Sequence, residues 1–291
     1  MTTLFVNCLT VIDASLLDPR RGLLGQSWLL DVELEGSLDR QGMVLDFGEV
    51  KKQIKRCVDR EIDHRLLVPT AYPGCRIEYR GAHCIVHFQL TSGAAIEHRG
   101  PATSCALIDA DSIDESSLAA AITRRLEPML PDNVVRARLR LHQEDIQGAC
   151  YQYSHGLKQH EGNCQRIAHG HRSRIQIFRD GQRSPELESD WAARWKDSYL
   201  GTRGDLKREL TRNDNHYYHF NYVAGQGLFD LILPQAQCYL IDTDSTVENL
   251  ARHICTTLKR EYPESDFRVV AFEGVGKGAV SESGDIAPAS E

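Results

Sequence analysis

Two histidines and a cysteine in the second half of the chain have the types and spacing expected of a metal site beside a reactive thiol. His169 and His171 belong to the stretch CQRIAHGHRSRIQI, which begins at Cys164 and continues as alternating polar and apolar residues. Residues i and i+2 of a β-strand project from the same face, so these two imidazoles would stand side by side. An isolated pair of this kind is also common on a surface strand, so a metal needs further ligands to be favoured.

A third ligand is predicted from the preceding strand. His155 ends the strand-like run YQYSH, and the segment between it and His169 can fold back as a hairpin loop. The hairpin would bring His155 opposite His169 and His171, with Cys164 in the loop. Three protein ligands with a fourth position left open are typical of catalytic zinc, so the sequence predicts Zn²⁺ here. A structural metal, or none, is the alternative.

The composition is that of an ordinary globular protein and argues against several classes of function. The chain has 291 residues, 41% of them hydrophobic and 26% charged, and a net charge of −7. This charge offers no basic surface to a nucleic acid, and no apolar run predicts a membrane span. The N-terminus lacks a signal-peptide pattern, and nine cysteines without a Cys-x-x-Cys pair indicate mostly reduced thiols. We therefore expect a cytoplasmic protein with neither nucleic-acid nor membrane partners.

An internal repeat predicts the elements that position these residues. LIDADS, which ends at Ser112, and LIDTDS, which ends at Ser245, each lead into a helical pattern, and a strand-like run (VVRARLRL or FRVVAF) follows each helix. In both copies a glutamate three residues after the serine, Glu115 or Glu248, predicts a capping box at the start of the helix. The repeat indicates two tandem domains, each close to the order β-β-α-β-β-α-β.

The expected fold class is α+β. Strands cluster in hairpins such as 75–90 and 216–233, which favours antiparallel sheets with helices packed on one face. The predicted domains are 1–148 and 149–291. Within the second, 182–215 is predicted as a long helix with flanking loops, and the closing stretch GKGAVSESGDIAPASE as a frayed tail.

With these segments in view, the chain resembles a tandem duplication of the 6-pyruvoyltetrahydropterin synthase family, which includes the 6-carboxytetrahydropterin synthases of queuosine (deazapurine) biosynthesis. The matching segments are His155, CQRIAHGH, TVENLARHI and FRVVAFEG in the second half and residues 36–68 in the first. The resemblance implies the T-fold, whose sheets join edge to edge into a β-barrel and so remove exposed edges. It also implies a homo-oligomer. A homotrimer is favoured, because three tandem chains supply six domains, and a two-chain assembly stays open.

The resemblance assigns the chemistry to residues of both halves. Zinc at the three histidines would bind the hydroxyls of the substrate's side chain, and Cys164 would be the base that abstracts a proton. Asp63 and His64, the only Asp-His dipeptide in the chain, would favour its thiolate form.

The same resemblance implies a set of pterin-binding residues. Glu273 would accept the two N–H groups of the pterin's aminopyrimidinone edge, as carboxylates do with guanidine-like groups. Thr246 and Glu248 match the family's Thr-x-Glu-Asn motif, although a capping role also accounts for Glu248.

The two halves differ in what they retain. An approximate alignment places Ser15, Leu24 and Gln26 where the second half has its zinc ligands, and the second half offers only RNDNHYYH where the first has Asp-His. These complementary losses predict one composite site per pair of halves. The sequence leaves open whether the halves that share a site belong to one chain or to two.

The predicted function is a zinc-dependent lyase that converts 7,8-dihydroneopterin triphosphate into 6-carboxytetrahydropterin. Four residues separate Cys164 from His169, and this spacing falls between those expected for the carboxy-forming and pyruvoyl-forming members. Formation of the pyruvoyl product therefore stays open. A pterin-binding protein without catalysis is a further alternative, since half of the duplicated sites have decayed.

Overall fold

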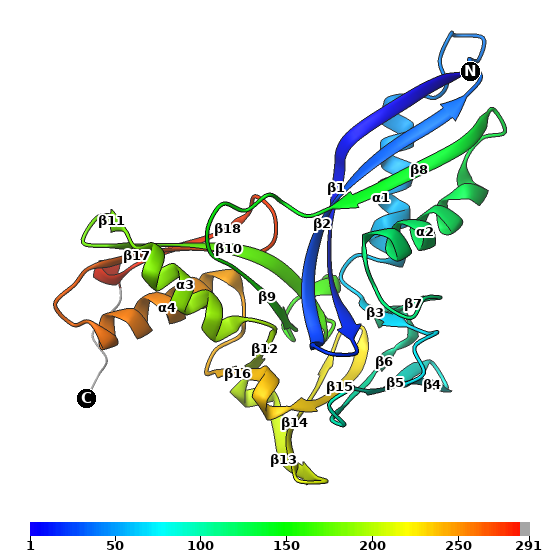
Figure 1. The fold of residues 1–291 in the computed structure, drawn as a ribbon. Coiled ribbons are helices and arrows are strands. Elements are labelled where there is room, and N and C mark those ends of the chain that lie inside the picture. The colour runs from blue at the N-terminus through cyan, green and yellow to red at the C-terminus, as the bar shows by residue number, and fades with distance from the viewer. Residues whose placement is uncertain (286–291) are drawn as a thin grey trace.

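The two halves of the chain are built from the same series of elements (Figure 1). The computed structural model describes residues 1–285. The first half contains β1 (Thr2–Asp18), β2 (Gly22–Gly36), α1 (Phe47–Glu61), β3 (Leu66–Pro69), β4 (Cys75–Arg80), β5 (His83–Gln89), β6 (Ala95–Pro101), β7 (Cys105–Ile108), α2 (Glu115–Leu126) and β8 (Val134–His142).

The second half repeats this order and adds two short strands, β11 and β18. Its elements are β9 (Cys150–His155), β10 (His169–Arg179), β11 (Gln182–Arg183), α3 (Pro185–Trp195), β12 (Ser198–Thr202), β13 (Leu206–Arg212), β14 (Asn215–Ala224), β15 (Gly227–Pro234), β16 (Cys238–Ile241), α4 (Val247–Glu261), β17 (Phe267–Phe272) and β18 (Gly278–Glu282). None of the helices within residues 1–285 combines the length and the apolar character needed to cross a membrane.

Each half has its own sheet with two helices packed on one face. The strand order is β7-β3-β1-β2-β8 in the first half and β16-β12-β9-β10-β17-β18 in the second, so the order repeats with the sequence. Leucine, isoleucine and valine side chains of α1 and α2 fill the first core, and those of α4, with two tryptophans of α3, fill the second. Because most neighbouring strands are antiparallel, the predicted α+β class is confirmed.

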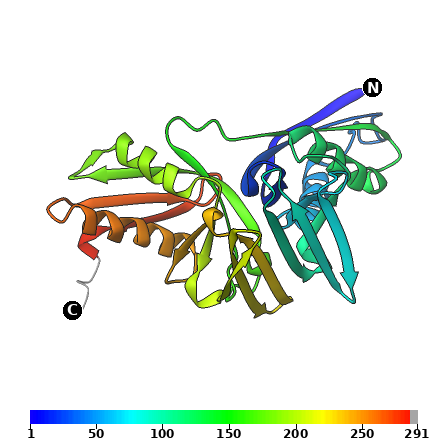
Figure 2. The ribbon, with the colours of Figure 1, turned by 60° about the horizontal axis from the view of Figure 1, so that its bottom comes forward.

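A third sheet joins the halves edge to edge. Its order is β13-β14-β15-β6-β5-β4, so strands of the second half continue directly into strands of the first. At the seam β6 and β15 run antiparallel, with His98 opposite Leu231. One apolar cluster beneath this sheet includes residues of both halves, among them Phe88 and Phe229. Figure 2 shows the two halves side by side, with the first on the right.

The halves are related by an approximate twofold axis, and equivalent residues meet on it. Ser15 Oγ donates a hydrogen bond to Ser154 Oγ at 2.7 Å, and their ladder partners, Gly25 and Gly170, are also in contact. A Cβ atom on Gly170 would lie 2.6 Å from Gly25 Cα, and one on Gly25 would overlap the carbonyl oxygen of Tyr153. Glycine is therefore required at both positions because the backbones touch there.

Both predicted capping boxes are wrong. α2 is capped by Asp114, which forms the box with Ser117, and α4 is capped by Thr246, whose hydroxyl accepts the N–H of Asn249. In each case a side chain one or two positions further along reaches the free N–H groups of the first turn better than the predicted serine.

Two of the predicted irregular regions contain strands. Residues 182–215 hold a helix, but α3 has only 11 residues instead of being long, and β12 and β13 follow it where a loop was expected. The expected tail forms β18 against β17 and a short turn of 3₁₀ helix; the rest of that prediction, residues 286–291, lies outside the described residues.

Candidate active site

The three histidines predicted as metal ligands converge in the second half. β9 and β10 pair so that His155 stands directly opposite His169, and His171 follows on the same face. All three side chains are buried. One ring nitrogen from each lies within 4.8 Å of the others, close enough to ligate a single ion.

Hydrogen bonds at Nδ1 orient these rings. His155 Nδ1 donates to the carbonyl oxygen of Ser245 at 3.0 Å, and His169 Nδ1 donates to that of Arg166 at 3.0 Å. Nε2 of His155 is buried and has no hydrogen-bond partner among the described residues. Burial lowers the pKa of both rings well below the usual value, so they are neutral, the form in which imidazole binds a metal.

The third ring faces a carboxylate from the other half. His171 Nδ1 lies 3.2 Å from Oδ1 of Asp13 on β1, and this oxygen also accepts a 2.5 Å hydrogen bond from Ser27. Burial alone would raise the pKa of Asp13, but His171, Lys277 and Ser27 together hold it well below its usual range. Asp13 is therefore ionised and suited to fix the tautomer of His171.

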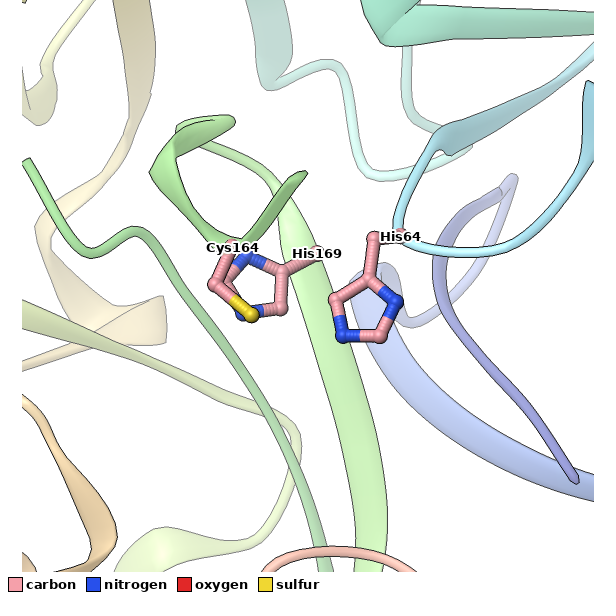
Figure 3. A group of neighbouring side chains, drawn as sticks. All are labelled: His64, Cys164 and His169. Carbon is pink, nitrogen blue, oxygen red and sulfur yellow. The ribbon is translucent and has the colours of Figure 1, made fainter. Parts of the chain in front are cut away.

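Cys164 and the Asp63-His64 pair come from different halves and meet beside the histidines. Cys164 lies in the loop between β9 and β10, and His64 just before β3 (Figure 3). Ligating atoms of His64, Cys164 and His169 all lie within 4.8 Å of one another. His64 Nδ1 lies 2.6 Å from Asp63 Oδ2, and Asp63 Oδ1 accepts the backbone N–H of Asp13 at 2.9 Å.

These contacts determine the charge of His64. Burial alone would lower the pKa of its ring, but hydrogen bonds with Asp63 and Cys164 raise it to about 10. The imidazolium is therefore the stable form at neutral pH, and it places a positive charge beside the side chain of Cys164.

Arg166 connects the two loops. Its guanidinium donates to the carbonyl oxygens of His64 at 3.2 Å and of Asp63 at 3.4 Å. Because Arg166 follows Cys164 by two residues and its own carbonyl orients His169, one residue links the thiol, a metal ligand and the Asp-His pair.

Of the predicted pterin-binding residues, Glu273 lies nearest to the histidines. It follows β17, its side chain is 21% exposed, and Oε1 lies 3.9 Å from His171 Nε2. Lys277 Nζ lies 3.7 Å from the other carboxylate oxygen and 3.3 Å from Asp13. Thr246 caps α4 and Glu248 is exposed in its first turn, so their contact with a substrate stays a prediction.

Three first-half residues were predicted to correspond to the zinc-ligand candidates of the second half, and one of the three is wrong. Leu16 pairs with Leu24 as His155 pairs with His169, and Ser15 pairs with Gly25 as Ser154 pairs with Gly170, which makes Leu16, not Ser15, the equivalent of His155. The remaining equivalents are Leu24 and Gln26, as predicted. All three side chains are buried, so the first half offers two alkyl groups and an amide where the second has imidazoles.

The second-half equivalent of His64 is also corrected. It is Asp197, two residues before Tyr199, and not a residue of RNDNHYYH. Asp197 keeps the left-handed backbone, with φ 56° against 54° for His64. Arg21 Nε donates to its carboxylate at 2.9 Å, so an ion pair occupies the position of the Asp-His pair.

Sequence reasoning missed Asp13, Ser245, Arg166 and Lys277. Ser245 could have been found, since it lies in the repeat, but its position suggested a helix cap. The other three act across loops or across the two halves, and no local pattern marks them.

Comparison with known proteins identifies the family. Residues 13–153 and 147–275 each match the family model described as 6-pyruvoyl tetrahydropterin synthase. The two matches span most of the chain in tandem, and the chain belongs to this family of pterin-processing lyases. Each half is a T-fold, as the sequence predicted.

Solved structures show a more distant likeness. The 6-pyruvoyltetrahydropterin synthase of Plasmodium vivax is 16% identical over 50% of this chain and 93% of its own, with a TM-score of 0.41. That of Plasmodium falciparum is 12% identical over 48% of this chain and 97% of its own, with a TM-score of 0.38. No curated protein gave a significant match.

Proposed function

We propose that this protein is a zinc-dependent 6-carboxytetrahydropterin synthase that acts on 7,8-dihydroneopterin triphosphate, as in queuosine biosynthesis. The observation that carries the proposal is the position of His64, which lies within reach of both Cys164 and the metal-ligand candidate His169. A decayed repeat would not need an Asp-His pair at that place. The first half is then a degenerate domain that supplies Asp63 and His64 to the site of the second.

The buried histidines fit a zinc ion. Their rings converge, and an oxygen atom lies beside each Nδ1. Nε2 of His155 has no hydrogen-bond partner among the described residues, so it is available to bind the ion. When bound, Zn²⁺ would supply positive charge that stabilises negative charge developing on the substrate's side chain.

Cys164 is the proposed base. The positive charge of His64 stabilises its thiolate, and the hydrogen bond to Asp63 holds the ring in place. After proton abstraction the neutral thiol and the imidazolium can return a proton to the substrate at a neighbouring atom. Arg166 keeps the two loops in register during these transfers.

The pterin ring is proposed to bind at Glu273. Its carboxylate can accept two N–H groups from the aminopyrimidinone edge, and Lys277 Nζ lies 3.7 Å from it. Thr246 and Glu248 are proposed as further substrate contacts, because the adjacent Ser245 touches the ligand His155.

Product analysis tests the proposal. Zinc-loaded protein is incubated with 7,8-dihydroneopterin triphosphate, and the products are separated. We expect 6-carboxytetrahydropterin with acetaldehyde and triphosphate. 6-Pyruvoyltetrahydropterin would instead assign the protein to the pyruvoyl branch, which the intermediate Cys164–His169 spacing leaves open. Absence of both products would contradict the enzyme proposal.

A pterin-binding protein without turnover is the second candidate, favoured by the leucines that replace two ligands in the first half. Cys164→Ala separates the readings. Loss of turnover with retained pterin binding supports the enzyme, whereas a wild type that binds pterin without turnover supports the binding protein.

A homo-oligomer in the cytoplasm, a trimer by preference, is part of the proposal. The outer strands of the sheets, such as β8 and β18, each have one edge that pairs with no other strand of residues 1–285 and that other copies can extend. Light scattering that gives a monomer would contradict the assembly.

A further inference from the structure

We propose a second divalent-metal site, formed by Cys8, Asp31 and His142 on the sheet of the first half. The three residues come from β1, β2 and β8, which are neighbours in that sheet. Their ligating atoms lie within 4.8 Å of one another. None of them belongs to the site around Cys164, and the proposal does not depend on the function proposed above.

A β-bulge in β1 places Cys8 beside the carboxylate of Asp31. On β1, Val6 pairs with Val32 and Thr10 pairs with Leu30, so the three residues between them face Asp31 alone. Cys8 has φ 49°, a left-handed conformation that is costly for a residue with a Cβ. Its N–H donates to Asp31 Oδ1 at 2.8 Å, which orients the carboxylate and leaves Oδ2 for another partner.

His142 completes the set. Its Nε2 lies 3.3 Å from Asp31 Oδ2, close to the roughly 3.3 Å between donors that bind one ion tetrahedrally at about 2.0–2.1 Å. Its Nδ1 lies 3.4 Å from the carbonyl oxygen of Gln143, to which it can donate. An N–H bonded to a carbonyl on the far side of the ring is the usual arrangement of a metal-binding histidine.

The ligand chemistry points to zinc. A thiolate, an imidazole and a carboxylate make a borderline-soft set that suits Zn²⁺ better than Ca²⁺ or Mg²⁺. Cys8 is exposed and the His142 side chain is 32% exposed, so an ion can enter and water can fill the fourth position.

The set has no equivalent in the other half. The ladders make Gln176 the counterpart of Asp31 and Phe272 the counterpart of His142. The cluster is therefore confined to the first half. A bound ion there would tie the bulge of β1 to the edge strand β8.

Zinc stoichiometry tests the site. Metal-free protein is titrated with Zn²⁺, and bound metal is measured after equilibrium dialysis. We expect wild type to bind one equivalent more than Cys8→Ser, and Cys75→Ser, a matched thiol control outside both clusters, to bind as wild type does. Loss of a residue that only hydrogen-bonds to a ligand raises a metal's dissociation constant by roughly 10–100-fold. Because Cys8 is proposed as a direct ligand, the dissociation constant of the additional zinc ion should rise by more than this in Cys8→Ser.

Two further variants make the result specific. His142→Asn should lose the same equivalent, whereas His169→Ala should keep it, so loss of the histidine-triad site is told apart from loss of this one. With Co²⁺, a thiolate-to-cobalt absorption band should persist in a Cys164→Ser, His169→Ala background and vanish when Cys8→Ser is added. Equal zinc binding by wild type, Cys8→Ser and His142→Asn would overturn the proposal and leave Asp31–His142 as an ion pair only.

Discussion

His64 is the residue at which the two halves depend on each other. It belongs to the half without the three converging histidines, yet its ring faces Cys164 and lies 5.2 Å from that of His169 between centroids. Its backbone is left-handed, which asparagine tolerates better than alanine does. We therefore expect His64→Asn to fold and bind zinc as wild type does, while kcat falls by about 10² or more, the usual loss of an acid–base partner.

Zinc content and turnover are measured on the same preparation. His87→Asn, a partly buried histidine of β5 outside the site, is the matched control and should retain activity. Full activity in His64→Asn would contradict the proposed role of the Asp63-His64 pair.

Asp13 is expected to affect zinc binding through its contact with His171. Because its carboxylate lies 3.2 Å from Nδ1 of His171 in the opposite half, we expect Asp13→Asn to weaken zinc binding by about 10–100-fold, the usual effect of removing a carboxylate that supports a metal ligand. Competition with a metal chelator measures this, with Asp59→Asn on the exposed face of α1 as the control. Unchanged affinity would show that Ser27 and Lys277, and not His171, are the functional partners of Asp13.

The sequence predicts the candidate metal ligands, but it does not predict the residues that contact and orient them. His155 opposite His169 follows from the period of a strand and the length of a hairpin loop. Asp13 could not be predicted, because its contact with His171 exists only after the two halves pack. Nothing in the local pattern distinguishes it from any other carboxylate on a strand.

At the scale of elements, the crossing of the β1–β2 and β9–β10 hairpins positions the site. A methyl group on Gly25 would overlap Tyr153 and lie 2.5 Å from the backbone nitrogen of His171. We expect Gly25→Ala to lower the free energy of unfolding by about 1–3 kcal/mol or more, because the backbone must move to admit it.

Denaturant unfolding measures this loss. Gly204→Ala provides the control, since a Cβ there meets no atom within 4 Å and its φ is ordinary. Equal stabilities of the two variants would mean that the hairpins do not pack this closely.

The same scale explains which elements were predicted. Helices α2 and α4 and the hairpins carry their own periodic patterns and were found. β12 was missed because its partners, β9 and β16, are parallel strands distant in sequence, so no turn or alternation marks it. The capping residues were misassigned since several polar side chains precede each helix and only the backbone geometry selects one.

At the scale of the whole molecule, the proposed composite site would form within one chain. Cys164 and His64 of the same polypeptide are neighbours, so two variants that each lack one of them cannot rebuild a site by exchanging chains. We expect a mixture of inactive His64→Asn and inactive Cys164→Ser to stay inactive after subunit exchange. Exchange is verified with differently tagged chains, and recovery of activity would place the functional pair between chains.

The contact between Gly25 and Gly170 also bears on how such a chain can evolve. In a dimer of identical subunits, every substitution on the twofold axis occurs twice and must be compatible with its own copy. Here the two positions are encoded separately, as are Ser15 and Ser154. Each half can therefore mutate without a mirrored change in the other, and Leu16 and Asp197 occupy the positions that His155 and His64 hold in the opposite halves.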